Sequence, residues 1–309
     1  MVLRRQRQSS DAAGRLETSE GAAEAAAARG RCGVSDAACT RPVLRYHGGK
    51  WNLADWIIQH FPEHRTYVEP FGGAASVLLR KPRAFHEVYN DMDGEVVNLF
   101  RVLRERGPEL LAAIELTPFA RAEFDLSYEP SYDAIERARR TLVRSHMGYG
   151  SNLTRPTESG RPQRTGFRRY GRARGSVPQV DWARLPVAIA AVVERLRGVV
   201  IEQRDAIEVL SNYDAPDALH YVDPPYVPES RDAGADYRHE MSAEDHERLA
   251  HTLHDLKGAV VLSGYASRLY DRLYGGWRRV EMATHADGAR KRTEVLWLSA
   301  KCWSVGLFA

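Results

Sequence analysis

A run of four residues, Asp223-Pro224-Pro225-Tyr226, combines the groups needed to act on an amine attached to a flat ring. The Asp223 carboxylate and the carbonyl oxygen of Pro224 are adjacent acceptors, which suit the two hydrogens of an amino group. Tyr226 offers an aromatic face for stacking, and the paired prolines stiffen the turn so that the acceptors are aimed before a substrate arrives. Because Asp and Pro are also ordinary turn formers, a plain strand-to-loop exit fits these four residues as well.

Four carboxylates stand at or just after the ends of predicted strands, and they are Glu69, Asp91, Asp205 and Asp223. In an open, mainly parallel sheet, ligands bind at the carboxyl ends of the strands, so these acids should converge on one rim. Neighbouring carboxylates repel one another unless a ligand rich in hydroxyl, amino and cationic groups lies between them. S-adenosylmethionine carries all of these groups, whereas the pyrophosphate of NAD favours a less acidic rim.

Two glycine turns lead into helices. The first is Tyr46-His47-Gly48-Gly49-Lys50, and the second, Phe71-Gly72-Gly73, follows the strand that ends at Glu69. Glycines let the backbone approach a ligand closely, and a lysine near a helix start can reach an anionic group. An ordinary loop-to-helix turn with a solvated lysine accounts for the first turn equally well. The order strand, glycine loop, helix and then an acid about twenty residues later is typical of a nucleotide-binding α/β unit.

Composition excludes several classes of protein. The chain has 309 residues and no apolar run of membrane-spanning length, and no hydrophobic secretory segment follows Met1, which predicts a cytoplasmic protein. Its three cysteines, Cys32, Cys39 and Cys302, are too few and too scattered for a disulfide framework or a four-cysteine zinc site. The formal net charge of +3 does not by itself indicate a nucleic-acid partner.

The sequence divides into a tail, a catalytic domain and an insertion. Residues 1–41 lack apolar periodicity, which predicts a disordered tail. Strands and helices alternate over 42–100 and 196–305, which we assign to the catalytic domain, and the segment 101–195 between them reads as an inserted recognition region. Near the end of the chain, 277–281 and 294–298 are expected to form an antiparallel hairpin.

The helix that begins after Ser242 is signalled by a capping box with Asp245 and is expected to end at Gly258. Four histidines lie on or near it. Because no tight ligand cluster accompanies them, we assign them to a solvated helix face and predict no metal site. They are His239, His246, His251 and His254.

The segment 151–175 is strongly basic, with Glu158 as its one acid. The guanidinium groups of arginines can form paired hydrogen bonds with phosphate oxygens and with the O6/N7 edge of guanine. Aromatic side chains between the arginines can stack near a displaced base. A soluble loop with no ligand is the alternative, but a position beside the acidic rim favours contact with double-stranded DNA. The arginines are Arg155, Arg161, Arg164, Arg168, Arg169, Arg172 and Arg174, and the aromatic residues at and around them are Tyr149, Phe167 and Tyr170.

These motifs together resemble those of a known family. The runs 46–50, 69–73, 90–91 and 223–226, with Asp205, occur in the order seen in Dam-like, D12-class DNA adenine-N6 methyltransferases. The resemblance extends from about residue 42 to about residue 299 and is greatest to phage-type and restriction-associated members. His47 and Ala74 depart from the residues that are common in the family at those positions.

The resemblance implies a Rossmann-like class I S-adenosylmethionine-dependent methyltransferase of the α/β class. Its sheet would be mainly parallel, with a C-terminal antiparallel hairpin and an inserted helical and basic recognition region. The implied activity is methyl transfer to N6 of a flipped-out adenine at a specific site in duplex DNA. The implied partner is double-stranded DNA, and a cognate restriction endonuclease is a further candidate partner. We expect a monomer in solution.

The resemblance also assigns roles to residues. Tyr46 and Lys50 would hold the methionine end of S-adenosylmethionine, and Glu69, Phe71 and Gly72 would complete that side of the cofactor site. Asp91 would take the ribose hydroxyls and Asp205 the adenine amine of the cofactor. Asp223, Pro224 and Tyr226 would be the catalytic residues, and Asp223 would also contact the amino end of the cofactor. Arg155, Arg161, Arg164, Arg168 and Arg169 would bind DNA.

Three alternatives share some of these features. A methyltransferase that acts on cytosine N4, on RNA or on a protein glutamine would use much of the same cofactor site. An NAD-linked dehydrogenase would share the glycine loop and the acid that follows it. A non-catalytic DNA-binding module could retain the fold without the reaction.

Overall fold

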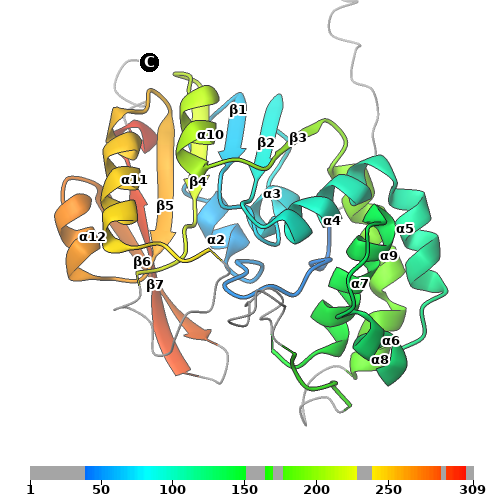
Figure 1. The fold of residues 1–309 in the computed structure, drawn as a ribbon. Helices are drawn as coiled ribbons and strands as arrows, with labels where there is room; N and C mark the ends of the chain where they lie inside the picture. The colour runs from blue at the N-terminus through cyan, green and yellow to red at the C-terminus, as the bar shows by residue number, and fades with distance from the viewer. Residues whose placement is uncertain (1–38, 151–163, 170–176, 228–238, 287–289, 304–309) are drawn as a thin grey trace, which may run out of the picture. The chain divides into compact units, whose positions relative to one another are not determined.

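The computed structural model describes residues 39–150, 164–169, 177–227, 239–286 and 290–303. Its centre is a seven-stranded sheet in the order β3-β2-β1-β4-β5-β7-β6 (Figure 1). Strands β1 to β5 pair in parallel, and β7 is antiparallel to both β5 and β6. The strands are β1 (Thr66–Glu69), β2 (His86–Asn90), β3 (Val199–Glu202), β4 (Ala218–Val222), β5 (Ala259–Gly264), β6 (Arg278–Ala286) and β7 (Arg290–Leu298).

Helices cover both faces of this sheet, because the residues of its parallel strands are apolar on both sides. In β1, Tyr67 packs with the core that includes α2 and α3, whereas the next residue, Val68, faces α10. In β4, Tyr221 belongs to the first core and Val222 packs with α11 and α12. The helices outside the insertion are α2 (Ala54–Ile58), α3 (Ser76–Arg80), α10 (Ala206–Asn212), α11 (Ala243–Asp255), α12 (Arg268–Leu273) and the 3-10 helix η2 (Ala300–Cys302).

The connection from β2 to β3 forms a helical layer beside the sheet (Figure 1). Trp182 of α8 donates its indole N–H to the carbonyl of Thr117 over 2.8 Å, which joins the two halves of this layer. Buried Arg139 of α7 pairs with Glu123 and Glu136. The helices are α4 (Gly94–Glu105), α5 (Gly107–Glu115), α6 (Arg121–Leu126), α7 (Ala134–Met147), α8 (Pro178–Ala183) and α9 (Leu185–Arg195).

The mainly parallel α/β fold and its C-terminal hairpin are confirmed. The predicted segments 277–281 and 294–298 do pair, with Arg279 opposite Trp297, but the two strands continue to Ala286 and Arg290. Within the described residues, no helix has both the length and the apolar composition needed to cross a membrane. Most of the predicted tail, residues 1–38, lies outside the described residues.

Two expectations for the helix after Ser242 are wrong. The capping box with Asp245 is present, but α11 ends at Asp255 rather than at Gly258. His246 does not lie on a solvated face, because it is fully buried against the hydroxyl of Tyr270. The histidine falls one turn before Leu249 and Ala250, so it belongs to the stripe that faces the sheet. Among the described residues, no cluster of possible metal ligands was found.

Candidate active site

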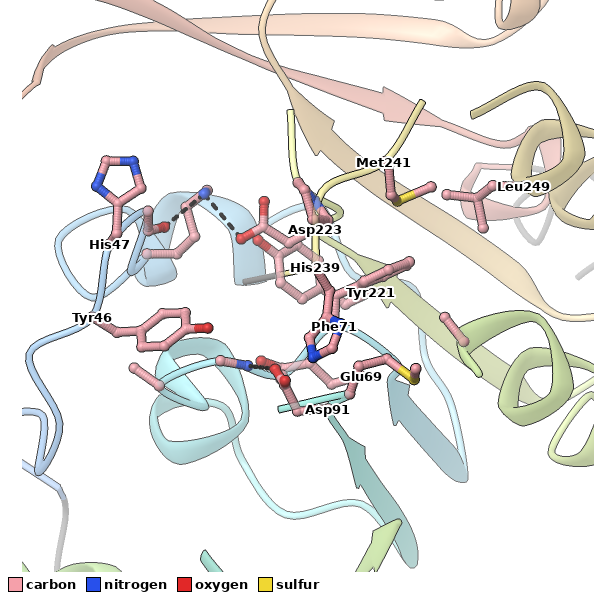
Figure 2. Close-up of a pocket in the computed structure, with 18 of the residues that line it drawn as sticks. Tyr46, His47, Glu69, Phe71, Asp91, Tyr221, Asp223, His239, Met241 and Leu249 are labelled. Atoms are coloured by element: carbon pink, nitrogen blue, oxygen red, sulfur yellow. Dashed lines mark hydrogen bonds and ion pairs between the residues drawn. The ribbon is translucent and has the colours of Figure 1, made fainter. Parts of the chain in front are cut away.

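A cavity of about 340 Å³ opens at the carboxyl edge of the sheet, where the strand order reverses between β1 and β4. Figure 2 shows Glu69, Asp91 and Asp223 around this cavity, with Tyr46 on one side and Met241 on the other. The structure brings all eight predicted cofactor residues together in its wall. They are Tyr46, Lys50, Glu69, Phe71, Gly72, Asp91, Asp205 and Asp223.

The floor of the cavity is the loop between β1 and α3, which lies directly against β2. Gly72 donates its backbone N–H to the carbonyl of Asn90 over 2.8 Å, and a Cβ added at Gly72 would stand 2.1 Å from the Tyr89 ring. Gly73 has a φ of 47°, in the left-handed region that favours glycine. The hydroxyl of Tyr89 donates to the carbonyl of Gly73, which fixes the loop from below.

Gly72→Ala is therefore expected to lower the free energy of unfolding by about 1–3 kcal/mol, the usual cost of overpacking. The new methyl group has to displace the Tyr89 ring, which is fully buried. Urea denaturation of the purified variant measures the effect. Gly276→Ala is the matched control, because a Cβ there meets nothing within 4 Å. Equal stability of the two variants would contradict the close approach at Gly72.

Asp91 is hydrogen-bonded to backbone N–H groups of two different loops, the cavity floor and the loop that follows β2. Its carboxylate accepts the N–H of Gly73 and the N–H of Asp93, each over 2.8 Å. Burial raises the pKa of Asp91 to about 6, although these two hydrogen bonds favour the ionised form. Asp205 caps α10 by accepting the N–H of Ile207 over 2.9 Å. Both carboxylates are thus held in place by backbone groups while they border the cavity.

Glu69 is almost completely buried at the end of β1. One of its oxygens, Oε2, accepts the hydroxyl of Tyr67 over 2.7 Å and the backbone N–H of Leu78 over 3.0 Å. Burial raises the pKa of Glu69 to about 8, and repulsion from Asp223 adds to the rise. A cation bound in the cavity would offset that cost, so the site favours a positively charged ligand group.

Asp223 is held by two side chains from different parts of the chain. Oδ2 lies 2.9 Å from Nζ of Lys50, and Oδ1 accepts the hydroxyl of Ser263 over 2.7 Å. Lys50 also donates to the carbonyl of Gly48 over 2.8 Å, so the first glycine turn is closed by its own lysine. The carboxylate therefore has a fixed orientation before any ligand binds.

The other two predicted catalytic residues, Pro224 and Tyr226, do not line the cavity. Both are described, and Pro225 between them borders the cavity. The Tyr226 ring is buried, with Nζ of Lys50 4.8 Å from its centroid and the Tyr265 ring packed edge-on at 4.6 Å. Its hydroxyl donates to the carboxylate of Glu294.

Several residues at this site were not assigned roles from the sequence. Ser263 lies near the end of β5, Tyr265 directly follows that strand, and Glu294 comes from β7, next to β5 in the sheet. His239, which was assigned to a solvated face, borders the cavity. Burial raises the pKa of Glu294 to about 7, and Lys50 opposes that rise. The sequence showed Ser263 at the end of an apolar strand, but not that this strand lies next to β4.

The described part of the basic segment, 164–169, packs on the helical layer. The Phe167 ring lies between Phe119 and Phe124, at centroid distances of 5.3 and 5.6 Å, so it is used for packing rather than for stacking on a base. The Arg164 guanidinium lies 5.2 Å from the Tyr128 ring, and Arg169 is exposed. Arg155, Arg161, Arg172 and Arg174 lie outside the described residues.

The last turn of α7 contacts both the backbone just before the first glycine turn and the basic segment. Ser145 accepts the N–H of Arg45 over 2.8 Å, and His146 donates from Nε2 to the carbonyl of Val43 over 2.9 Å. On the other side, the N–H of Arg168 donates to the carbonyl of Met147 over 2.7 Å. One helix end thus supports the backbone before Tyr46 and the backbone that carries the arginines.

Comparison with known proteins agrees with this geometry. Residues 46–286 match the family model of D12 class N6 adenine-specific DNA methyltransferases. The chain belongs to this family. The match begins at Tyr46 and spans β1 to β6, so it covers the cavity and the helical layer together. The predictions of the family, of the fold and of adenine-N6 methylation of DNA are confirmed.

Curated relatives of this D12-class methyltransferase include several DNA adenine methylases. The chain is 28% identical to the DNA adenine methylase of Serratia marcescens over 230 residues, which cover 70% of this chain and 78% of the relative. It is 32% identical to that of Escherichia coli (strain K12) over 116 residues, 35% of this chain and 41% of the relative. For a Vibrio cholerae DNA adenine methylase the identity is 36% over 64 residues, or 21% and 23% of the two chains.

Proposed function

We propose that this DNA adenine methyltransferase uses S-adenosylmethionine and binds it in the cavity at the carboxyl edge of the sheet. That cofactor supplies an activated methyl group on a sulfonium centre. The observation that carries the proposal is the convergence of Glu69, Asp91, Asp205 and Asp223 in one wall, because four carboxylates require a ligand with many hydrogen-bond donors and positive charge.

The contacts of each carboxylate support the division of roles. Asp91 and Asp205 are held by backbone N–H groups and keep further lone pairs for a ligand, which suits ribose hydroxyls and an adenine amine respectively. Asp223 pairs with Lys50 of the first glycine turn, Tyr46 of the same turn also borders the cavity, and Glu69 lies in the same cavity wall. We assign the methionine end of the cofactor to that side, with Phe71 and Gly72 forming the floor.

For the reaction itself, we propose that Asp223 and the carbonyl oxygen of Pro224 accept hydrogen bonds from the two N–H groups of the N6 amine of the target adenine. The lone pair of N6 is delocalised into the ring, and two fixed acceptors favour the pyramidal amine whose lone pair is free to attack. The target base has to leave the duplex at a cost of a few kcal/mol. The Tyr226 ring is buried beside the cavity rather than in its wall. Stacking of the base on it, which we propose to be worth about 1–3 kcal/mol, therefore requires a ring face to become exposed when DNA binds.

Methyl transfer from tritiated S-adenosylmethionine to duplex DNA tests this proposal directly. We expect label in N6-methyladenine after digestion of the DNA, and none in cytosine. Label in N4-methylcytosine, in RNA or in protein would favour one of the other amine-directed reactions. Expression in a methylation-free host, followed by single-molecule sequencing, would then give the recognition sequence. DNA binding without any methyl transfer would overturn the catalytic assignment.

We further propose that Arg155, Arg161, Arg164, Arg168 and Arg169 contact DNA phosphates. For the described pair, Arg168→Ala with Arg169→Ala is expected to flatten the log-log salt dependence of DNA affinity by about 0.9 per lost phosphate contact. Fluorescence anisotropy over a series of salt concentrations measures this slope. The control pair is Arg268→Ala with Arg272→Ala, two exposed arginines on α12. An unchanged slope in the first pair would exclude backbone contact there.

Three further assignments rest on the sequence alone: a monomeric state in solution, a cytoplasmic location and cooperation with a cognate restriction endonuclease. Light scattering of the purified protein tests the first of these. A mass equal to that of one chain, 34.8 kDa, is the expected result.

A further inference from the structure

A second buried carboxylate stands beside the proposed catalytic one. Glu294 of β7 accepts the hydroxyl of Tyr226, and its Oε1 lies 3.9 Å from Nζ of Lys50. The same Lys50 ammonium is 2.9 Å from Asp223 and 4.8 Å from the centre of the Tyr226 ring. Glu294 therefore contacts both the Lys50 ammonium and the Tyr226 hydroxyl, and through Lys50 it is connected to Asp223, so it borders the residues that we assign to the target adenine.

Glu294 occupies a position that packing alone would give to an apolar residue. Side chains alternate along a strand, so Glu294 shares a face with Leu296 and Leu298, which both belong to the main core. Its side chain is 3% exposed. A buried carboxylate is costly unless it is paired and hydrogen-bonded, and Lys50 and Tyr226 are the partners that compensate it here.

We propose that Glu294 is a positioning residue for methyl transfer to DNA. It fixes the Tyr226 ring through the phenolic hydroxyl, and it shares the Lys50 charge so that Asp223 keeps its capacity to accept the adenine amine. The inference rests on the proposed function of Asp223 and Tyr226. It predicts an effect on the transfer step and on the bound base, and little effect on cofactor affinity.

The first test is a double-mutant cycle with Glu294→Gln and Tyr226→Phe. Each single variant is expected to lower the single-turnover rate at saturating DNA and cofactor by about tenfold. If Glu294 acts through the Tyr226 hydroxyl, the double variant is no slower than the slower single variant. Multiplication of the two losses would overturn the inference. Glu281→Gln on β6 is the control, because Glu281 is exposed and pairs with Arg279.

The second test is the pH profile of the same rate. The titratable groups that face Glu294 are Lys50, Asp223, Tyr221, Tyr226 and Tyr265. Since Glu294 has its pKa raised to about 7 by burial, the wild-type rate is expected to fall as the pH drops through 7 and the carboxylate is protonated. Glu294→Gln, which is neutral at every pH, is expected to be slow and to lack this limb. An unchanged limb in Glu294→Gln would count against the inference.

Two further measurements separate the possible failures. Cofactor affinity from calorimetry is expected to change less than threefold, roughly, in Glu294→Gln, whereas a general loss of structure would reduce it together with the rate. If Glu294→Gln does not fold, Tyr226→Phe and the wild-type pH profile still test the contact from the other side. Wild-type transfer with an unaffected Glu294→Gln rate refutes this inference alone. Absence of wild-type transfer refutes it together with the proposed function.

Discussion

Asp223→Ala is expected to abolish methylation of DNA, with a loss of about 10³-fold or more in the transfer rate, while cofactor binding only weakens. The substitution removes the acceptor for the adenine amine and leaves Lys50 buried without its nearest carboxylate. Single-turnover assays with tritiated cofactor measure the rate, and calorimetry measures the cofactor affinity. Full activity of Asp223→Ala on duplex DNA would refute the assignment.

A control on the same strand separates this effect from general damage. Asp217 immediately precedes the opposite end of β4, where its half-exposed side chain pairs with Arg65. Asp217→Ala should leave the transfer rate within about twofold of the wild type, since an exposed ion pair contributes at most about 1 kcal/mol to stability. A large loss of activity in this control would mean that disruption of β4, rather than loss of the Asp223 carboxylate, reduces the transfer rate.

Tyr226→Ala is the substitution with the second largest expected effect, a loss of about 100-fold in turnover. The ring is both the proposed platform for the flipped base and the group that lies under the Lys50 ammonium. Fluorescence of a 2-aminopurine placed at the target position should show that the variant also holds the extrahelical base less well. A wild-type rate with a wild-type fluorescence change would remove Tyr226 from the reaction.

Truncation of a buried tyrosine also creates a cavity, which by itself costs stability. Tyr274→Ala provides the comparison, because Tyr274 is also buried but packs against Tyr270 and Trp297 and does not line the cavity. Assays well below both melting temperatures should therefore show a large rate loss for Tyr226→Ala and a small one for Tyr274→Ala. Equal losses would indicate that the effect comes from packing.

The sequence was sufficient to predict the sheet and the convergence of four acids at one cavity. Strands of a parallel sheet read as short apolar runs, and the acids at their ends mark the edge where ligands bind. Glu69 and Asp91 could therefore be placed in one cavity without knowledge of the strand order. The first glycine turn could be placed too, because its residues matched a family motif.

The network behind Asp223 could not be predicted in the same way. Ser263 contacts Asp223 because β5 pairs with β4. Glu294 lies beside Lys50 and Tyr226 because β7 pairs with β5. Such neighbours depend on strand order and register, which local sequence patterns do not specify. His246 was misjudged for a related reason, since the pattern of a helix shows its apolar stripe but not which polar residue at the edge of that stripe will be covered.

The last turn of α7 connects the cavity at the edge of the sheet with the proposed DNA contacts. Its hydrogen bonds to Arg45 and Val43 lead to Tyr46 in the cavity wall, and its bond to Arg168 leads to the proposed DNA contacts. A shift of this turn when DNA binds would be transmitted to the cavity wall by a path of a few residues. Thermodynamic reciprocity then requires that the methyl donor change the affinity for DNA by the same factor by which DNA changes the affinity for the methyl donor.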